Sequence, residues 1–237
     1  MLDLNSRDLI FAGGYMVDLK YIHHSAFYIK SEGKGILIDP WIDKNEKFNW
    51  REEQIDDILL THAHGDHLGN AVEIAKEKNI QITTVFETAK YLEKEYGVKT
   101  KSIGLGAWIS YPWGRAVFLP AFHSNSLPDG SYGGVAASII IDVDGVRIFH
   151  AGDTCLTGEM KTIKELYAPQ IALLPIGGTY TMDVEHAAMA AKWLGVKTVI
   201  PMHYGTFPEI EADLKKFAQL IAVGNTTCQI LDTDSIG

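Results

Sequence analysis

Residues 61–67 read Thr-His-Ala-His-Gly-Asp-His, so four side chains that can bind a transition metal fall within six positions. They are His62, His64, Asp66 and His67. Neutral imidazole and carboxylate groups bind zinc, manganese or iron, and this segment contains no thiolate. The whole chain has 9 histidines, and the gathering of three of them here argues against a solvated polar loop. The segment therefore predicts a metal site.

The local pattern explains how these side chains could converge. The segment follows an apolar run at residues 58–60, which predicts a buried strand, and precedes a helical pattern over residues 68–78. In an extended chain, residues two positions apart point to the same side, so His62 and His64 can share one ion. The other two members of the cluster then turn toward a second position nearby. Four ligands cannot saturate two ions, so further ligands are expected along the chain.

Three more candidates lie just past the ends of hydrophobic strand patterns: His123, Asp153 and His203. Layered α/β folds commonly present binding residues at such places. Each residue alone would be more typical of a turn or of a packed histidine. Together with the first cluster, they form a candidate ligand set.

In order, these seven residues match the metal ligands of the metallo-β-lactamase-fold hydrolases, which the chain resembles from about Val17 to its C-terminus. Shorter matches resemble a poorly characterised UPF0173-like group of bacterial and archaeal metal-dependent hydrolases, close to the ascorbate-6-phosphate lactonase branch. These matches are residues 24–27, 37–41, 150–154 and 201–208. Such a ligand set is specific for the fold and for a dinuclear site. It is much less specific for the substrate, because one fold hosts many activities.

The resemblance implies two divalent metal ions and assigns their ligands. It places His62, His64 and His123 on the first ion, Asp66, His67 and His203 on the second, and Asp153 as a bridge between them. Zinc is the first expectation, and manganese, nickel and iron are the alternatives for this donor set. Strands and helices mix in both halves of the chain, which favours an α/β fold of two packed sheets covered by helices, a four-layer αββα sandwich.

We expect one domain over residues 1–237, with residues 1–15 as a candidate N-terminal extension because the family-like pattern begins at Val17. Leu9-Ile10-Phe11 could pair at a sheet edge. The turn Asp144-Gly145 predicts a two-residue hairpin, and Asp183 predicts a helix N-cap. Strands are expected near 17–23, 25–31, 35–39, 57–61, 81–85, 106–111, 115–121, 135–143, 145–150, 170–175, 197–201 and 227–231. Helices are expected over 68–78, 87–96, 158–167, 184–194 and 208–222.

Four residues are candidates for contacts with the substrate or with the ligands: His24, Asp39, His186 and Tyr204. His24 lies beside a turn, where it could either point into the cleft and contact the substrate or a ligand, or have a purely structural role. Asp39 ends a strand pattern and could accept the distal N–H of a metal-binding histidine. His186 falls in a first helical turn that could border the site, and Tyr204 could hydrogen-bond a substrate oxyanion. His150 lies inside a strand pattern, which favours a packed core histidine.

The resemblance implies a hydrolase in which a hydroxide held between two ions attacks a small anionic or polar ester, lactone or phosphodiester. Asp66 is the only carboxylate of the first cluster, and we predict a catalytic acid–base role for it. The alternative is a phosphodiesterase or nuclease acting on nucleotides or short nucleic acid. A di-iron redox protein is disfavoured, because that branch of the fold carries Glu where this chain has His64.

The composition of the chain limits the classes of protein to which it can belong. A chain of 237 residues with 46% hydrophobic content can bury a substantial core. Its 21 basic and 30 acidic residues weigh against an extended nucleic-acid track, so a small molecule is the expected partner. No apolar run approaches the roughly 20 residues of a membrane span. The 2 cysteines and the lack of a recognisable secretion signal predict a cytoplasmic protein, and the oligomeric state is open.

Overall fold

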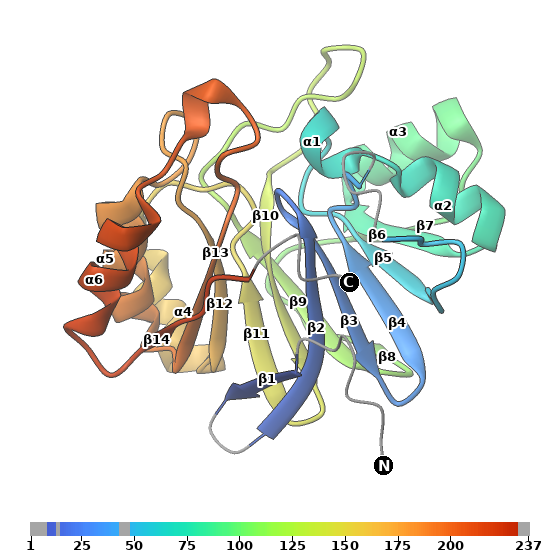
Figure 1. The fold of residues 1–237 in the computed structure, drawn as a ribbon. Coiled ribbons are helices and arrows are strands. Elements are labelled where there is room, and N and C mark those ends of the chain that lie inside the picture. The colour runs from blue at the N-terminus through green and yellow to red at the C-terminus, as the bar shows by residue number, and fades with distance from the viewer. Residues whose placement is uncertain (1–8, 13–14, 43–47, 232–237) are drawn as a thin grey trace.

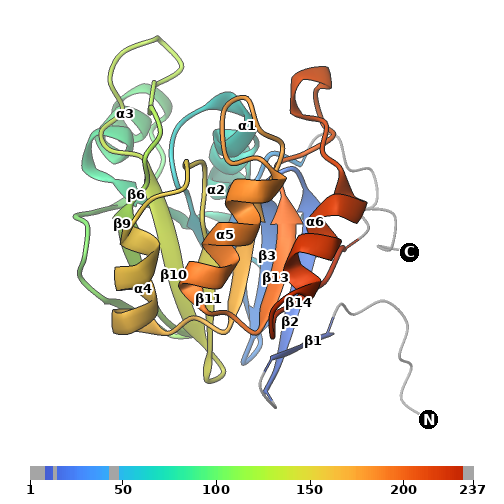
Figure 2. The ribbon, with the colours of Figure 1, turned by 90° about the vertical axis from the view of Figure 1, so that its left-hand side faces the viewer.

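Two sheets pack face to face and carry helices on their outer faces (Figure 1). The computed structural model describes residues 9–12, 15–42 and 48–231. In the view turned by 90°, α4, α5 and α6 lie in front of the second sheet (Figure 2). This arrangement confirms the predicted αββα sandwich.

The described part of the first sheet has 7 strands in sequence order. They are β1 (Leu9–Ala12), β2 (Tyr15–His23), β3 (Ala26–Ser31), β4 (Lys34–Ile38), β5 (Asp57–Leu59), β6 (Gln81–Val85) and β7 (Thr100–Ile103). Strands β1 to β4 are antiparallel, and β4 to β7 are parallel. The carboxyl ends of β4 and β5 therefore lie at the same edge of the sheet.

The second sheet repeats this layout. Its described strands are β8 (Ile109–Tyr111), β9 (Gly114–Pro120), β10 (Ala137–Val143), β11 (Val146–His150), β12 (Ile171–Pro175), β13 (Thr198–Met202) and β14 (Thr227–Cys228). Strands β8 to β11 are antiparallel, and β11 to β14 are parallel. Strands β9, β11 and β13 thus end at one edge, where the loops that follow them can meet.

The helices follow the parallel strands of each half. They are α1 (Gly65–Leu68), α2 (Ala71–Lys78), α3 (Phe86–Tyr96), α4 (Glu159–Tyr167), α5 (Val184–Leu194) and α6 (Leu214–Ala222), with a short 3-10 helix, η1, at Pro208–Ile210. Asp183 caps α5 by accepting the backbone N–H of His186 at 2.8 Å, which confirms the predicted N-cap. None of the helices in the described residues combines the length and apolar character needed to cross a membrane.

Alternation along the strands divides the buried side chains between two cores. Phe27 and Ile29 of β3 belong to the larger core, which joins the two sheets, whereas Ala26 and Tyr28 belong to the core beneath α2 and α3. Successive residues of a strand point to opposite faces, so a sheet covered on both faces needs apolar residues at both sets of positions. This is why the strand patterns read as continuous apolar runs.

Several local predictions are confirmed. Val143 pairs with Val146 across the Asp144-Gly145 turn, and both turn residues have positive φ, as a two-residue hairpin of this kind requires. Leu9–Ala12 pairs with β2 at the edge of the first sheet, a pairing that the sequence allowed but did not decide. The candidate N-terminal extension covers residues 1–15. Of these, residues 1–8 and 13–14 lie outside the described residues.

One strand of the structure was not predicted, and two expected helices are each divided. Strand β7 was not predicted, because Thr100–Ile103 is only partly buried and partly polar. The helix expected over 208–222 is divided into η1 and α6, since Asp213 begins a new helix by capping the N–H of Lys216. The helix expected over 68–78 is broken between α1 and α2 at Gly69, whose φ is 39° and ψ is −121°.

Gly69 has little tolerance for a side chain. A Cβ at this position would lie 2.4 Å from the Trp41 Cα and 2.5 Å from the Pro40 carbonyl oxygen, both of which are backbone atoms. We expect Gly69→Ala to lower the free energy of unfolding by about 2–5 kcal/mol, from backbone strain and overpacking together. Chemical denaturation of the variant and the original protein would measure this difference in the free energy of unfolding. Gly158→Ala is the control, because nothing lies within 4 Å of a Cβ there, and a loss of similar size in the control would contradict the explanation.

Candidate metal centre

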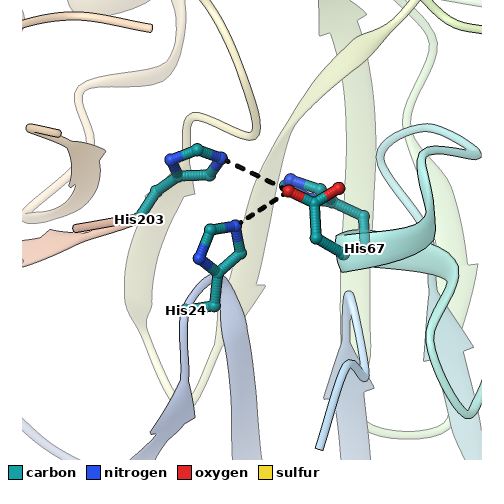
Figure 3. A group of neighbouring side chains, drawn as sticks. His24, His67 and His203 are labelled. Carbon is teal, nitrogen blue, oxygen red and sulfur yellow. Dashed lines mark hydrogen bonds and ion pairs between the residues drawn. The ribbon is translucent and has the colours of Figure 1, made fainter. Parts of the chain in front are cut away.

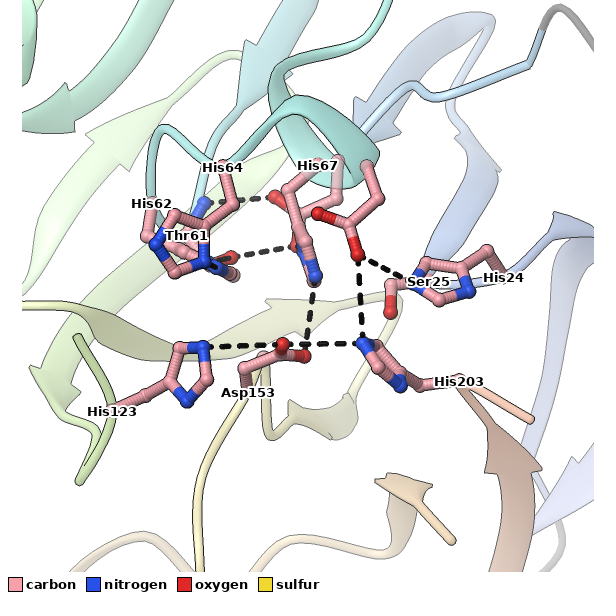
Figure 4. Close-up of polar contacts among 12 residues, drawn as sticks. His24, Ser25, Thr61, His62, His64, His67, His123, Asp153 and His203 are labelled. Atoms are coloured by element: carbon pink, nitrogen blue, oxygen red, sulfur yellow. Dashed lines mark hydrogen bonds and ion pairs between the residues drawn. The ribbon is translucent and has the colours of Figure 1, made fainter. Parts of the chain in front are cut away.

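The candidate ligands gather at one edge of the sandwich, in loops and a short helix that follow strand ends (Figure 4). Residues 62 and 64 follow β5, and α1 carries residues 66 and 67. The loops after β9, β11 and β13 bring His123, Asp153 and His203 to the same place. All seven residues predicted as ligands from the sequence therefore lie together.

The first group consists of His62, His64 and His123, whose ligand atoms all lie within 4.8 Å of one another. The Nε2 atom of His62 is 3.0 Å from the Nδ1 atom of His64. His62 is fully buried, and burial lowers its pKa well below the ordinary value. The imidazole is therefore neutral at pH 7 and offers a lone pair, the form that binds a metal.

The second group consists of His24, Asp66, His67 and His203, again with ligand atoms within 4.8 Å of one another. Figure 3 shows the three imidazoles converging on one point from separate elements. The Oδ2 atom of Asp66 lies 3.1 Å from His24 Nε2 and 3.7 Å from His203 Nε2. Burial opposes the ionisation of Asp66, but the hydrogen bond from His24 and the nearby imidazoles outweigh it and lower its pKa. Asp66 is therefore an ionised acceptor.

Asp153 lies between the two groups. One oxygen, Oδ1, is 3.2 Å from His67 Nε2, and the other, Oδ2, is 3.1 Å from His203 Nε2 and 3.5 Å from His123 Nε2. The side chain is only 3% exposed. A carboxylate that touches imidazoles of both groups is suitably placed to bridge two ions.

Four buried atoms of three candidate ligands make no well-formed hydrogen bond among the described residues, although some lie close to one another: His67 Nε2, Asp153 Oδ1 and both ring nitrogens of His203. Buried polar atoms are nearly always paired, because an unpaired one costs about 1–3 kcal/mol. These atoms are nitrogen and oxygen donors of the kind that bind divalent transition metals. The residues present therefore fit the metal ions that the sequence predicted.

Asp39 orients ligands in both groups. Its Oδ2 accepts hydrogen bonds from His67 Nδ1 and from the Thr61 hydroxyl, each at 2.7 Å, and its Oδ1 accepts from the Thr61 backbone N–H at 2.8 Å. Because the Thr61 hydroxyl donates to Asp39, its oxygen accepts from His62 Nδ1 at 3.0 Å. One carboxylate thus fixes the proton on Nδ1 of two histidines and turns both Nε2 atoms toward the centre. Although burial opposes it, Asp153 and Asp39 raise the pKa of His67, so a metal ion that binds its Nε2 would displace a proton from that atom. Thr61 was not singled out from the sequence.

We expect Asp39→Asn to weaken metal binding by about 10–100-fold, the usual effect of losing a partner of a ligating histidine. The amide keeps the volume of the side chain but leaves one donor in this buried site without an acceptor. Competition with a chromogenic chelator would measure the affinity. Asp56→Asn is the matched control, since Asp56 pairs with Lys34 away from the centre. Equal affinities in the two variants would show that Asp39 does not support the ligands.

The turn between β2 and β3 connects the two halves of the centre. The His24 carbonyl accepts the backbone N–H of His203 at 2.8 Å. His150 donates from Nε2 to the Ser25 carbonyl at 2.9 Å and accepts the Gly152 N–H at its Nδ1 at 3.1 Å. His150 is buried, as expected, but it also holds this turn against the loop that carries Asp153. That role depends on contacts between sheets, which a strand pattern does not reveal.

The His24 side chain is completely buried and bonded at both nitrogens. Its Nε2 lies 3.1 Å from Asp66 Oδ2, and its Nδ1 lies 2.7 Å from the Thr206 hydroxyl. Since a carboxylate can only accept, Nε2 carries the proton and Thr206 donates to Nδ1. Burial lowers the pKa of His24 to about 4, so the ring is neutral at pH 7. His24 is therefore a neutral donor that holds the Asp66 carboxylate.

The chain is similar to known proteins over most of its length. The sequence profile of the beta-lactamase superfamily domain matches residues 18–203. A UPF0173 metal-dependent hydrolase of Thermofilum pendens is 41% identical over 221 residues, which cover 90% of this chain and 94% of the relative. One from Bacillus cereus is also 41% identical over 221 residues, 90% of this chain and 96% of the relative.

A solved structure agrees with these sequence relationships. Igni18, described as a novel metallo hydrolase from the archaeon Ignicoccus hospitalis, superposes with a TM-score of 0.84 at 38% identity, covering 92% of this chain and 95% of that chain. The chain belongs to the UPF0173 metal-dependent hydrolases of the beta-lactamase superfamily. The resemblance found in the sequence and the prediction of a hydrolase are confirmed.

Two of the predicted contact residues of the hydrolase, His186 and Tyr204, belong to neither group of candidate ligands. His186 is exposed in the first turn of α5, where its Nδ1 lies 3.3 Å from Asp183. Tyr204 is half-buried against the larger core and lines a cavity with Tyr21 and Thr206. A substrate contact through either residue stays a prediction.

Two buried side chains that the sequence analysis did not select as site residues hold the ligand loops. The Oδ1 atom of Asn125 accepts the N–H of Ala63, which lies between the first two histidines, at 2.9 Å. The Thr154 hydroxyl accepts the N–H of Phe122, next to His123, at 3.1 Å. Thr154 directly follows Asp153 in the sequence, and Asn125 lies two positions after His123. That proximity is the only signal in the sequence, because amides and hydroxyls in loops have no pattern of their own.

Proposed function

We propose that this hydrolase binds two divalent ions and hydrolyses a small substrate that presents an anionic or strongly polar group, such as a phosphodiester, lactone or ester. The main support is the set of buried nitrogen and oxygen atoms on His67, Asp153 and His203 that make no well-formed hydrogen bond, at the place where two groups of candidate ligands meet. Seven donor residues exceed what one tetrahedral ion uses. Zinc is the first candidate, with manganese, nickel and iron as alternatives.

Bound ions of this kind supply Lewis acidity and a hydroxide nucleophile at neutral pH. The chain itself must hold its ligands and move a proton. The Asp66 side chain is 26% exposed, whereas the Asp153 side chain is 3% exposed. Asp66 is thus the carboxylate that a substrate can reach, and His24 holds it in place. We assign to Asp66 the acceptance of a proton during attack and its return to the leaving oxygen.

Nucleotides and short nucleic acids belong to this substrate class, because a phosphodiester needs only to reach the centre. A long nucleic-acid track is not part of the proposal, since the formal net charge is −9. A di-iron redox activity is the least favoured alternative, because His64 occupies the position where that branch of the fold carries Glu. The cytoplasmic setting remains a prediction.

A panel of chromogenic phosphodiesters, lactones and esters, tested with zinc-, manganese- and nickel-loaded protein, would examine the proposal. We expect turnover of at least one class, lost on chelation and regained on adding metal. No turnover of any class with any metal, together with oxygen consumption by the iron-loaded protein, would contradict the proposal and favour the redox alternative.

A further inference from the structure

The loop that follows His123 lines a shallow, open cavity of about 430 Å³ beside this ligand. Hydrogen bonds within the loop, residues 124–134, fix its shape. Asn125 is central to them, because its backbone and side chain both bond to Gly133, each at 2.8 Å, while its Oδ1 holds Ala63. The cavity is therefore built into the fold at a fixed position relative to the first group of ligands.

Three hydroxyl groups that line this cavity make no hydrogen bond within the described part of the chain: those of Ser124, Ser126 and Tyr132. In contrast, the Ser131 hydroxyl donates to Asp129 at 2.6 Å and serves the loop itself. Tyr132 is 68% exposed, so its ring also offers a flat face. These groups can donate to or accept from a bound molecule without breaking a contact in the protein.

The cavity lacks fixed charge. None of the described residues that line it is a lysine, arginine, aspartate or glutamate, and His123 is its only basic group. A phosphate or carboxylate placed there would lose hydration without gaining a cationic partner, in a chain whose formal net charge is −9. A neutral group with several hydroxyls would lose less, because the protein hydroxyls replace its water.

From these observations we infer that the cavity binds an uncharged, hydroxyl-bearing ring of the substrate, of the kind found in sugars. The group that is hydrolysed lies at the metal centre while this ring occupies the cavity beside His123. The inference rests on the proposed hydrolytic function and adds the chemistry of the part of the substrate that does not react. It makes Ser124, Ser126 and Tyr132 specificity-determining residues.

Three matched probes test the inference. Each is a p-nitrophenyl phosphodiester, and its second ester group is a methyl glucoside, a cyclohexyl ring or a carboxyethyl group. We expect the glucoside probe to have the highest kcat/KM, by about tenfold over the cyclohexyl probe, since each neutral hydrogen bond contributes up to about a factor of ten. Preference for the carboxyethyl probe, or equal rates for all three, would overturn the inference.

Variants of the cavity residues test whether their hydroxyl groups cause the preference for the glucoside probe. The double variant Ser124→Ala with Ser126→Ala should lower kcat/KM about tenfold for the glucoside probe and leave the cyclohexyl probe within twofold of its original value. Tyr132→Phe should act in the same direction. Ser110→Ala is the control, because this exposed serine of β8 lines another cavity with Asp144 and Gly145, away from His123. Equal losses for both probes would indicate a structural effect and contradict the inference.

Binding measured without turnover separates this inference from the proposed function. Saturation-transfer NMR with methyl glucoside on the metal-loaded protein should give a signal that the double variant loses and the Ser110→Ala variant keeps. If the signal behaves in this way while no probe is hydrolysed, the proposed function fails and the cavity assignment stands. If the probes are hydrolysed but the wild-type protein gives no signal, the cavity assignment fails and the hydrolase stands.

Discussion

Replacing Asp66 by Asn is expected to lower kcat by about 10²–10⁴-fold while substantial metal remains bound. The amide keeps the shape of the side chain and one oxygen that can bind a metal, but it cannot accept a proton, and general acid–base catalysis contributes a factor of this size. Because the Asp66 carboxylate is ionised in the folded protein, its charge is available at pH 7. Bound metal and turnover should be measured on the same sample.

The simpler explanation is that Asp66 only holds an ion. In that case the variant would lose metal, and excess metal would restore turnover. Asp56→Asn provides a control for the loss of one carboxylate elsewhere on the protein, and its turnover should be unchanged. Near-normal turnover of the Asp66→Asn variant at full metal occupancy would end the acid–base assignment.

Replacing Asp153 by Asn should have a different consequence, loss of metal. Asp153 is buried and touches imidazoles of both ligand groups, so its charge would neutralise the ions on each side. Removing one partner of a buried charge pair costs about 3–5 kcal/mol, equivalent to roughly a 10²–10⁴-fold weaker binding of at least one ion. We expect metal content to fall to about one ion per chain or less, and kcat/KM to fall by a similar factor or more.

Elemental analysis of the desalted variant and turnover at rising metal concentration would measure both effects. Thermal unfolding in the presence of excess metal would show whether the variant still folds. Full metal content with normal turnover would refute the bridging role of Asp153. The two Asp→Asn variants thus separate a carboxylate that moves protons from one that holds the ions.

The ligands could be predicted from the sequence because their chemistry is concentrated in one short segment and at the ends of strands. His62, His64, Asp66 and His67 are close in sequence, so local backbone geometry alone brings them near one another. The hairpin at Asp144-Gly145 was predictable for the same reason, since two adjacent residues determine the turn. Local sequence patterns were therefore sufficient to predict the fold class and the candidate ligands.

The supporting contacts depend on tertiary structure and could not be predicted in this way. The helix breaks at Gly69 because the backbone of Trp41 lies against it, 28 positions away in the sequence. His150 reaches across from β11 to the turn at Ser25, and Thr206 reaches His24 from the loop after β13. Nothing in the neighbouring residues specifies such distant partners. Asp39 is the exception, because a histidine ligand usually needs an acceptor and Asp39 ends a strand at the correct edge.

The number of ions that the chain binds tests the central claim most directly. Metal-depleted protein would be titrated with zinc while bound metal and turnover of the best chromogenic substrate are followed together. The two-ion account predicts saturation near two zinc ions per chain, with most of the turnover appearing as the second ion binds. Saturation at one ion per chain with full turnover would contradict it.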